Sequence, residues 1–312
     1  MSLPRQILSR VCRRGISTGR PVSPPPRRSR RFYIATFAAG AAAGIAYYNF
    51  TPAPPSRLNP DTFTPYTLAS HTPISTRPTE TSLLTLSPPA GAAPPPFSPT
   101  HVQSVEIKHP QVQIARHYTP LPPAAEGDAA IRLLVKREPA GEMSRYLFAL
   151  ATGATVELRG PHEEYALPPP DAASKLLFLA GGTGIAPALQ AAYKLLENSA
   201  EAEARVLWAV RHRGESQGAA AAEVERLQAR YPGRLEVEVC PDPEGGMKPG
   251  TVSDGVQRWG ADRIVVCGPD GFVAYWAGPR GPWVGGREQQ GELGGVLGGL
   301  VEGREVEVWK MS

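Results

Sequence analysis

The feature that most constrains this chain is an apolar run that leads through a glycine-rich turn into a helical pattern. Residues 175–180 read KLLFLA, residues 181–187 read GGTGIAP, and the helical pattern continues to residue 197. An apolar run without polar alternation is typical of a strand buried on both faces, as in parallel sheets that helices cover. The segments expected to complete an α/β doubly wound parallel sheet are strands over 205–210, 235–240, 263–268 and 305–310, and a helix over 221–231.

The part of the chain before residue 166 has a different hydropathy pattern, in which apolar and polar residues alternate. Alternation predicts the half-buried strands of an antiparallel sheet. We expect a strand or hairpin over 63–86, a helix that begins near Ser144, and a domain boundary in the Pro-rich segment 166–172. The strands expected of this small antiparallel β-barrel are 102–109, 112–119, 131–137 and 155–160. The expected domains are a Pro-rich linker with the first strands over 51–100, the barrel over 101–168 (starting near 61), and the sheet domain over 172–312.

The basic character of the chain is confined to its N-terminus. The net charge is +4, yet the first sixty residues carry ten Arg, no Lys and no acidic residue. From residue 61 onward 23 basic side chains stand against 29 acidic ones, which gives this part a net charge of −6. Since a nucleic-acid-binding surface needs basic clusters on the folded part, no nucleic-acid partner is expected.

Two N-terminal segments predict targeting and membrane attachment. Residues 1–31 are rich in Arg and Ser, with apolar residues between the arginines, which is typical of a mitochondrial targeting leader; the alternative is a disordered basic tail. Residues 32–50 carry no charge, and as a helix they would span roughly 28 Å, close to the hydrocarbon core of a bilayer. They predict a single transmembrane anchor, and the alternative is a buried Ala-rich helix or a part of the cleaved leader. The arginines before the span predict that the bulk of the chain lies in the intermembrane space.

The cysteines and histidines predict no metal site. Cys12, Cys240 and Cys267 show no ligand spacing such as C-x-x-C, and the six histidines show no paired spacing. The sequence also shows no His–Asp or paired-carboxylate arrangement for acid–base catalysis.

Four short motifs carry the candidate chemistry, and each has an ordinary structural alternative. Gly181–Pro187 lies at a strand-to-helix turn, where glycines let the backbone approach a pyrophosphate and the helix N-terminus offers free N–H groups. Arg116–Thr119 (RHYT) ends a barrel strand, and Gly141–Ser144 (GEMS) opens a helix that Ser144 can cap. Cys267–Phe272 (CGPDGF) forms a turn at the carboxyl end of the sheet, where ligands of such sheets bind. Taken alone, each motif has an ordinary structural explanation. Gly181–Pro187 can be a tight turn without a ligand, Arg116–Thr119 a plain strand end, Gly141–Ser144 an ordinary capped helix, and Cys267–Phe272 a buried cysteine followed by a turn.

Taken together, the motifs resemble the ferredoxin–NADP reductase superfamily, most closely its cytochrome b5 reductase-like members. The segments that carry the resemblance are RHYTP, LLVKREPAGEMSRYL, GATVELRGP, FLAGGTGIAPALQ and VVCGPDGF, within residues 101–275. The resemblance implies an FAD-binding barrel of the FR type followed by an NAD(P)-binding domain. It further implies an FAD-dependent oxidoreductase that transfers a hydride from NAD(P)H to flavin N5.

The resemblance also assigns site residues, with Thr119 facing flavin N5 and Cys267 at the nicotinamide as the candidate catalytic pair. The residues expected to bind FAD are Arg116, Tyr118, Thr119, Val135, Lys136, Arg137, Gly141, Met143 and Ser144. The residues expected to bind the nicotinamide nucleotide are Gly182, Thr183, Gly184, Pro187, Cys267, Gly268 and Pro269. The superfamily often ends in an aromatic residue, whereas Trp309 is followed here by three more residues, so neither Trp309 nor Trp283 is assigned a role.

With the leader, the anchor and residues 274–286 (AYWAGPRGPWVGG), the chain is similar to fungal inner-membrane flavoproteins that support haem attachment to cytochrome c. This similarity implies a haem or haem protein as electron acceptor and the inner mitochondrial membrane as location. Two alternatives stay open: a mitochondrial NADH–cytochrome b5-type reductase, and a cytochrome c assembly factor whose flavin fold is a non-catalytic scaffold. The choice between NADH and NADPH is also open, because Arg211 and Arg213 are either 2′-phosphate ligands or exposed arginines at a strand end.

Overall fold

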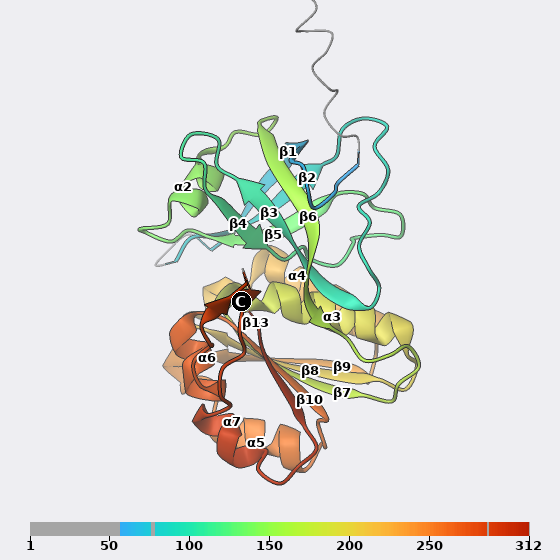
Figure 1. Ribbon diagram of the computed structural model, residues 1–312, viewed down its shortest axis with the longest axis vertical. Coiled ribbons are helices and arrows are strands. Elements are labelled where there is room, and N and C mark those ends of the chain that lie inside the picture. The colour runs from blue at the N-terminus through green and yellow to red at the C-terminus, as the bar shows by residue number, and fades with distance from the viewer. Residues whose placement is uncertain (1–56, 76–78, 286, 312) are drawn as a thin grey trace, which may run out of the picture. The chain divides into compact units, whose positions relative to one another are not determined.

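The computed structural model describes residues 57–75, 79–285 and 287–311. The predicted leader and transmembrane anchor, residues 1–31 and 32–50, lie outside these ranges. Within them, no helix has the length and apolar character needed to cross a membrane. The described residues form an antiparallel sheet followed by a parallel sheet, together with one short two-stranded hairpin (Figure 1).

The antiparallel sheet has six strands in the order β4-β3-β6-β1-β2-β5. Its alternating pattern turns Leu84, Leu133 and Leu158 into a common core, which the buried Met143 and Leu147 of α2 cover. The predicted barrel is a half-barrel, because the described strands form no ladder between β4 and β5. The elements are β1 (Thr64–Ser75), β2 (Thr81–Ser87), β3 (His101–Lys108), β4 (Ala115–Tyr118), β5 (Ile131–Lys136), α2 (Glu142–Ala149) and β6 (Thr155–Ala166).

The parallel sheet has five strands in the order β13-β10-β7-β8-β9, and its doubly wound form is as predicted. Helices α3 and α4 lie on the face toward the half-barrel, and α5, α6 and α7 lie on the opposite face (Figure 1). The strands are β7 (Lys175–Gly181), β8 (Glu203–Val210), β9 (Leu235–Pro241), β10 (Arg263–Cys267) and β13 (Glu307–Met311). The helices are α3 (Ile185–Asn198), α4 (Gly218–Arg230), α5 (Pro249–Gln257), α6 (Asp270–Ala277) and α7 (Gly295–Leu300), with short 3-10 turns η1 (Gly182–Gly184), η2 (Arg213–Ser216) and η3 (Asp242–Glu244).

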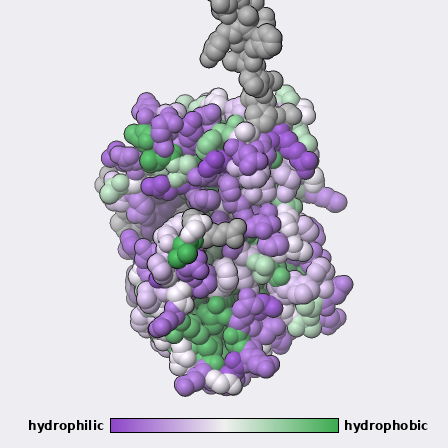
Figure 2. All heavy atoms as spheres, viewed as in Figure 1, coloured by the Kyte–Doolittle hydropathy of each residue, from purple (hydrophilic) through white to green (hydrophobic). Residues whose placement is uncertain are grey.

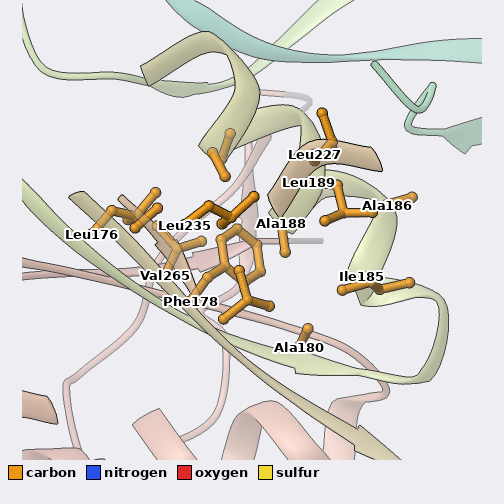
Figure 3. Packing of buried hydrophobic residues seen from close by; sticks show 14 of the residues in the cluster. Leu176, Phe178, Ala180, Ile185, Ala186, Ala188, Leu189, Leu227, Leu235 and Val265 are labelled. Atoms are coloured by element: carbon orange, nitrogen blue, oxygen red, sulfur yellow. The ribbon is translucent and has the colours of Figure 1, made fainter. Parts of the chain in front are cut away.

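The apolar run of β7 is explained by its central position in the sheet. Phe178 is fully buried and packs with Ala188 and Leu189 of α3 on one side of the sheet (Figure 3). On the other side, Leu177 and Leu179 pack with the α5–α7 layer. Helix α3 is buried almost all round because it lies between this sheet and the half-barrel.

A set of hydrogen bonds ties the half-barrel to the helices of the parallel sheet, and we call it the interdomain clamp (Arg132, Gln190 and Glu223). The guanidinium of Arg132 on β5 donates to both carboxylate oxygens of Glu223 on α4, at 3.0 and 3.1 Å. The amide of Gln190 on α3 accepts from the Gln103 backbone N–H at 2.7 Å and donates to the Pro120 carbonyl at 2.8 Å. Burial alone would raise the pKa of Glu223, but hydrogen bonds from Arg226 and Arg132 hold that pKa below its usual range.

The glycine-rich segment after α6 holds structure that the sequence did not predict. It contains the hairpin of β11 (Trp283–Val284) and β12 (Arg287–Glu288), and then α7. Helix α6 begins inside the CGPDGF motif, which was expected to be only a turn. These short elements are stabilised by tertiary contacts rather than by local periodicity, as the fully buried Leu297 of α7 illustrates.

Candidate cofactor cleft

A cleft of about 720 Å³ opens where the half-barrel meets the carboxyl edge of the parallel sheet. Figure 2 shows a recess between the two parts of the molecule with hydrophilic residues around it. The cleft is lined by all of the predicted site residues except Val135 and Arg137. Those that line it are Arg116, Tyr118, Thr119, Lys136, Gly141, Met143, Ser144, Gly182, Thr183, Gly184, Pro187, Cys267, Gly268 and Pro269.

The half-barrel contributes a cation and a neutral phenol to the cleft through β4. Arg116 is exposed and donates through Nη1 to its neighbouring carbonyl at 2.8 Å, and within the described ranges no carboxylate pairs with it. Burial raises the pKa of Tyr118 to about 12, and the nearby Arg116 lowers it by less, so the phenol is neutral at physiological pH. Thr119 follows directly and is half-buried. The uncompensated Arg116 leaves one positive charge available to an anionic group in the cleft.

The GEMS segment forms the entrance to α2, but Ser144 does not cap this helix. The N-cap is Gly141, and no side chain bonds its free N–H groups. The Ser144 hydroxyl instead accepts from the Glu138 N–H at 3.0 Å and donates to the Gly141 carbonyl at 3.0 Å, which holds the preceding loop. The free N–H groups of the first turn therefore remain available to an anion, although Glu142 at the same turn opposes it.

The sheet contributes a glycine cradle. Gly182 has a φ of +57°, in the left-handed region that favours glycine, and its carbonyl accepts from Trp208 Nε1 at 2.8 Å. A Cβ on Gly184 would lie 2.5 Å from the Cys267 carbonyl oxygen, and one on Gly268 would lie 3.0 Å from the Gly181 Cα. The turns after β7 and β10 therefore pack backbone to backbone, and α3 with Pro187 in its first turn begins directly behind them.

Cys267 ends β10 at the floor of the cleft. Its side chain is buried, and burial raises the pKa of the thiol to about 12, although Arg280 lowers it slightly. The thiol is therefore protonated and uncharged at physiological pH. It gives the cleft a soft, neutral surface rather than a nucleophile.

The predicted stretch 135–137 contributes one side chain to the cleft. Lys136 lines the cleft, whereas Val135 is buried in the half-barrel core. Arg137 pairs with Glu80 at 2.5 Å on the surface. The sequence predicted that the backbone of this stretch runs beside the FAD. The structure places the side chains of Val135 and Arg137 away from the cleft.

The sequence missed a histidine–carboxylate cluster beside the cleft, where no such arrangement was expected. His117, inside the RHYT motif, lines the cleft, and its Nδ1 lies 2.8 Å from the Ser104 hydroxyl and 3.6 Å from Glu164 Oε1. The His162 ring stands edge-on to it at 5.1 Å, and burial lowers the pKa of His162, with the charge of His117 acting in the same direction. Pairing of β4 with β3 and of β3 with β6 creates this cluster, and that register was not visible in the sequence.

The described residues fit a flavin and a nicotinamide nucleotide. A glycine cradle without Cβ atoms, an uncompensated Arg116 and free helix N-termini suit phosphate groups. A neutral thiol and a neutral phenol suit uncharged planar rings. No group of three or more His, Cys, Asp or Glu residues suitable for a metal ion occurs in the described part of the chain.

Two family models match this chain. The oxidoreductase FAD-binding domain matches residues 80–166, and the oxidoreductase NAD-binding domain matches residues 178–277. The first range covers most of the half-barrel, and the second covers the parallel sheet from β7 to α6. Among solved structures, the cytochrome b5 reductase domain of Ulva prolifera nitrate reductase has a TM-score of 0.54 at 23% identity, covering 72% of this chain and 92% of that chain. At this identity the likeness shows the fold alone.

The relatives similar in sequence include the following three proteins. NADH-cytochrome b5 reductase 2-A of Vanderwaltozyma polyspora is 27% identical over 59% of this chain and 63% of that protein, so the chain spans less than two thirds of it. An uncharacterized FAD-binding protein of Schizosaccharomyces pombe is 27% identical over 91% of this chain and 98% of that protein. The cytochrome c mitochondrial import factor CYC2 of Saccharomyces cerevisiae is 37% identical over 21% of this chain and 22% of that protein.

Proposed function

Because the chain belongs to the FAD- and NAD-binding oxidoreductases of the ferredoxin–NADP reductase superfamily, we propose that it is a membrane-anchored NAD(P)H oxidoreductase that delivers electrons to a haem iron. The observation that carries the redox part is the cleft, which brings RHYT and GEMS of the half-barrel together with GGTGIAP and CGPDGF of the sheet. When bound, FAD accepts a hydride from the nicotinamide and can release electrons singly to iron.

The residues of the half-barrel bind and orient the flavin. Arg116 neutralises pyrophosphate charge, and the N–H groups at the start of α2 bind phosphate oxygens. Tyr118 would offer a neutral phenol and Thr119 a hydroxyl to the flavin on this side of the cleft. Buried Met143 and Leu134 in the cleft wall exclude water from this side.

The residues of the sheet bind the nicotinamide nucleotide. Gly182 and Gly184 would let the backbone approach its phosphates, because Gly182 has a left-handed φ of +57° and a Cβ on Gly184 would meet the Cys267 carbonyl oxygen. Gly268 and the neutral Cys267 would form the surface that holds the nicotinamide. The two backbone turns would hold the nicotinamide close to the flavin, and this proximity would accelerate hydride transfer without an acid or base at the reacting atoms.

Two of the charged residues that follow β8 support NADH over NADPH, whereas the exposed Arg211 is still a candidate ligand for a 2′-phosphate. Arg213 forms a two-point ion pair with Glu244, so its charge is already compensated. Glu215 is buried beside Gly182, and its Oε1 has no hydrogen-bond partner among the described residues. An acidic side chain after the second strand of such a sheet accepts a hydrogen bond from the ribose 2′-hydroxyl and repels a 2′-phosphate. Glu215→Gln should therefore raise the use of NADPH relative to NADH.

The acceptor and location rest on the N-terminal sequence and on the relatives. The acid-free leader over 1–31 and the uncharged span over 32–50 support attachment to the inner mitochondrial membrane, with the folded part in the intermembrane space. The similarity to the cytochrome c mitochondrial import factor supports a role in the cytochrome c pathway, and haem attachment is the role there that the sequence resemblance implies. The net charge of −6 from residue 61 onward suits a basic haem-protein partner.

Comparing acceptors tests this proposal. The full chain, loaded with FAD and supplied with NADH, should reduce haem offered with apocytochrome c faster than it reduces cytochrome b5. The reverse order favours the second candidate, a cytochrome b5-type reductase, which the NADH-cytochrome b5 reductase relative supports. If Arg116→Met abolishes flavin binding yet leaves cytochrome c maturation intact in cells, the fold acts as a non-catalytic scaffold.

A further inference from the structure

A second pocket, of about 320 Å³, lies along the C-terminal half of α3, and we call it the proline pocket. This volume is at the lower end of the range of about 300–1,000 Å³ for small-molecule sites. The proline pocket is lined by Pro94, Pro95, Phe97, Ser98, Pro99, Pro120, Leu121, Pro122, Pro123, Asp128, Ala130, Gln190, Tyr193, Lys194, Glu197 and Asn198. None of these residues lines the cofactor cleft.

Much of the wall of the proline pocket is formed by proline rings and two aromatic rings. Two proline-rich segments of the half-barrel, 94–99 and 120–123, line it together with Tyr193 of α3, and Phe97 adds a second aromatic ring. Proline rings have no rotamer freedom to lose when a ligand packs against them, so such walls favour an apolar or aromatic ligand body.

The proline pocket also holds a buried positive charge. Lys194 is only 8% exposed, and its Nζ donates to the His101 carbonyl at 2.6 Å and to Gln103 Oε1 at 3.5 Å. The Phe97 ring centroid lies 5.6 Å from the same nitrogen. Within the described part of the chain no carboxylate pairs with Lys194, and burial lowers its pKa to about 8. Its neighbours therefore satisfy its hydrogen bonds but not its charge.

Neither of the two carboxylates that line the proline pocket forms an ion pair with Lys194. Asp128 accepts from the Ala130 N–H at 3.0 Å within its own loop. Glu197 accepts from Arg230 at 3.0 Å and also from the Tyr231 hydroxyl. A ligand anion that reached Lys194 would compensate a charge that the protein leaves open.

We propose that the proline pocket binds a small apolar carboxylate, with its carboxylate against the Lys194 ammonium and its hydrocarbon or aromatic body between the prolines and Tyr193. The pocket lies at the interface of the two parts, because half-barrel residues and α3 residues line it together and the Gln190 amide of α3 donates to the Pro120 carbonyl in its wall. A ligand there contacts both the half-barrel and α3.

The ligand pair naphthoate and naphthamide tests this, because they share a ring system and differ in charge. Binding is followed by naphthalene fluorescence on the full chain, loaded with FAD and saturated with NAD⁺ so that the cofactor cleft is filled. Naphthoate should bind saturably and at least tenfold more tightly than naphthamide. Lys194→Met should remove this tenfold preference, whereas Lys248→Met, at an exposed lysine, should keep it.

A second variant covers the case in which Lys194→Met fails to load FAD. Ala130→Trp fills the proline pocket without changing the charge, and it should weaken naphthoate at least tenfold while the flavin spectrum is unchanged. The proposal is overturned if naphthoate shows no saturable binding, if naphthamide binds as tightly, or if FAD-loaded Lys194→Met and Ala130→Trp both bind naphthoate like the unmodified chain.

Discussion

The cofactor cleft and the interdomain clamp both lie between the half-barrel and the parallel sheet. They differ in whether their charged side chains are paired with one another. In the clamp, Arg132 and Glu223 are 13% and 4% exposed and bond each other through two hydrogen bonds. In the cleft, Arg116 is exposed and unpaired among the described residues, and the turns after β7 and β10 expose glycine backbone. The paired groups fix the distance between the two sheets, and the unpaired groups remain for a ligand. A clamp substitution should therefore cost stability, and a cleft substitution should cost ligand binding.

The largest effect is expected in the clamp, from Glu223→Gln. The change leaves Arg132 and Arg226 beside an uncharged amide in a buried site, where breaking an ion pair costs about 3–5 kcal/mol. Urea unfolding of the FAD-free chain should show this loss in the free energy of unfolding. Glu225→Gln, at an exposed position of the same helix, is the control and should change it little. A loss of stability equal to that of the control would mean that the clamp does not hold the sheets.

Gly184→Ala should disrupt the nicotinamide site and slow flavin reduction by NADH, while the chain still folds. The added Cβ would lie 2.5 Å from the Cys267 carbonyl oxygen, so the turns after β7 and β10 must separate. Relieving this contact moves the two turns apart by roughly 1 Å, and a misplacement of that size between reacting groups lowers the reaction rate by about 100-fold. The rate of flavin reduction by NADH measures it. Gly299→Ala, where a Cβ meets nothing within 4 Å, is the control. Full activity in Gly184→Ala would show that the two turns do not form the site.

Arg116→Met should weaken FAD binding without destabilising the FAD-free chain. A hydrogen bond to a charged group contributes about 1.5–3 kcal/mol, which corresponds to a loss of affinity of about 10- to 100-fold. Titration of the FAD-free chain with FAD gives the dissociation constant, and Arg145→Met on the exposed side of α2 is the matched control. A loss of stability in Arg116→Met would contradict the contrast between cleft and clamp.

Cys267 is a buried titratable group in the cleft wall, and it predicts a loss of stability at alkaline pH. Its thiol has a pKa of about 12 in the folded chain against an ordinary value of 9.0, so the folded state holds the proton more tightly than the unfolded state. The stabilisation is therefore complete below pH 9 and declines as the pH rises toward 12. Urea unfolding between pH 7 and pH 10 should show a shallower decline in Cys267→Ala. An equal decline in both proteins would mean that the thiol does not titrate with unfolding.

Much of the cofactor cleft could be predicted from the sequence, whereas the interdomain clamp and the histidine–carboxylate cluster depend on contacts between segments far apart in the chain. The run KLLFLA and the glycine turn predict a buried parallel strand and a phosphate cradle because both signals lie within a few consecutive residues. His117 and Glu164 meet only because β4 pairs with β3 and β3 with β6, and no local pattern encodes that pairing. Ser144 carries the right residue type for a cap, but the helix begins at Glu142 and turns the hydroxyl back to the preceding loop. Helix α7 is glycine-rich and depends on packing, so its sequence shows no helical period.

Anaerobic mixing of the FAD-loaded full chain with NADH tests the central claim most directly, because it requires both halves of the cleft at once. The flavin absorbance should bleach on mixing, with the NADH-driven rate exceeding the NADPH-driven rate, and Gly184→Ala should slow bleaching without changing the initial spectrum. Flavin that binds with its normal spectrum but does not bleach with either nucleotide would contradict the claim that this cleft brings the two cofactors together.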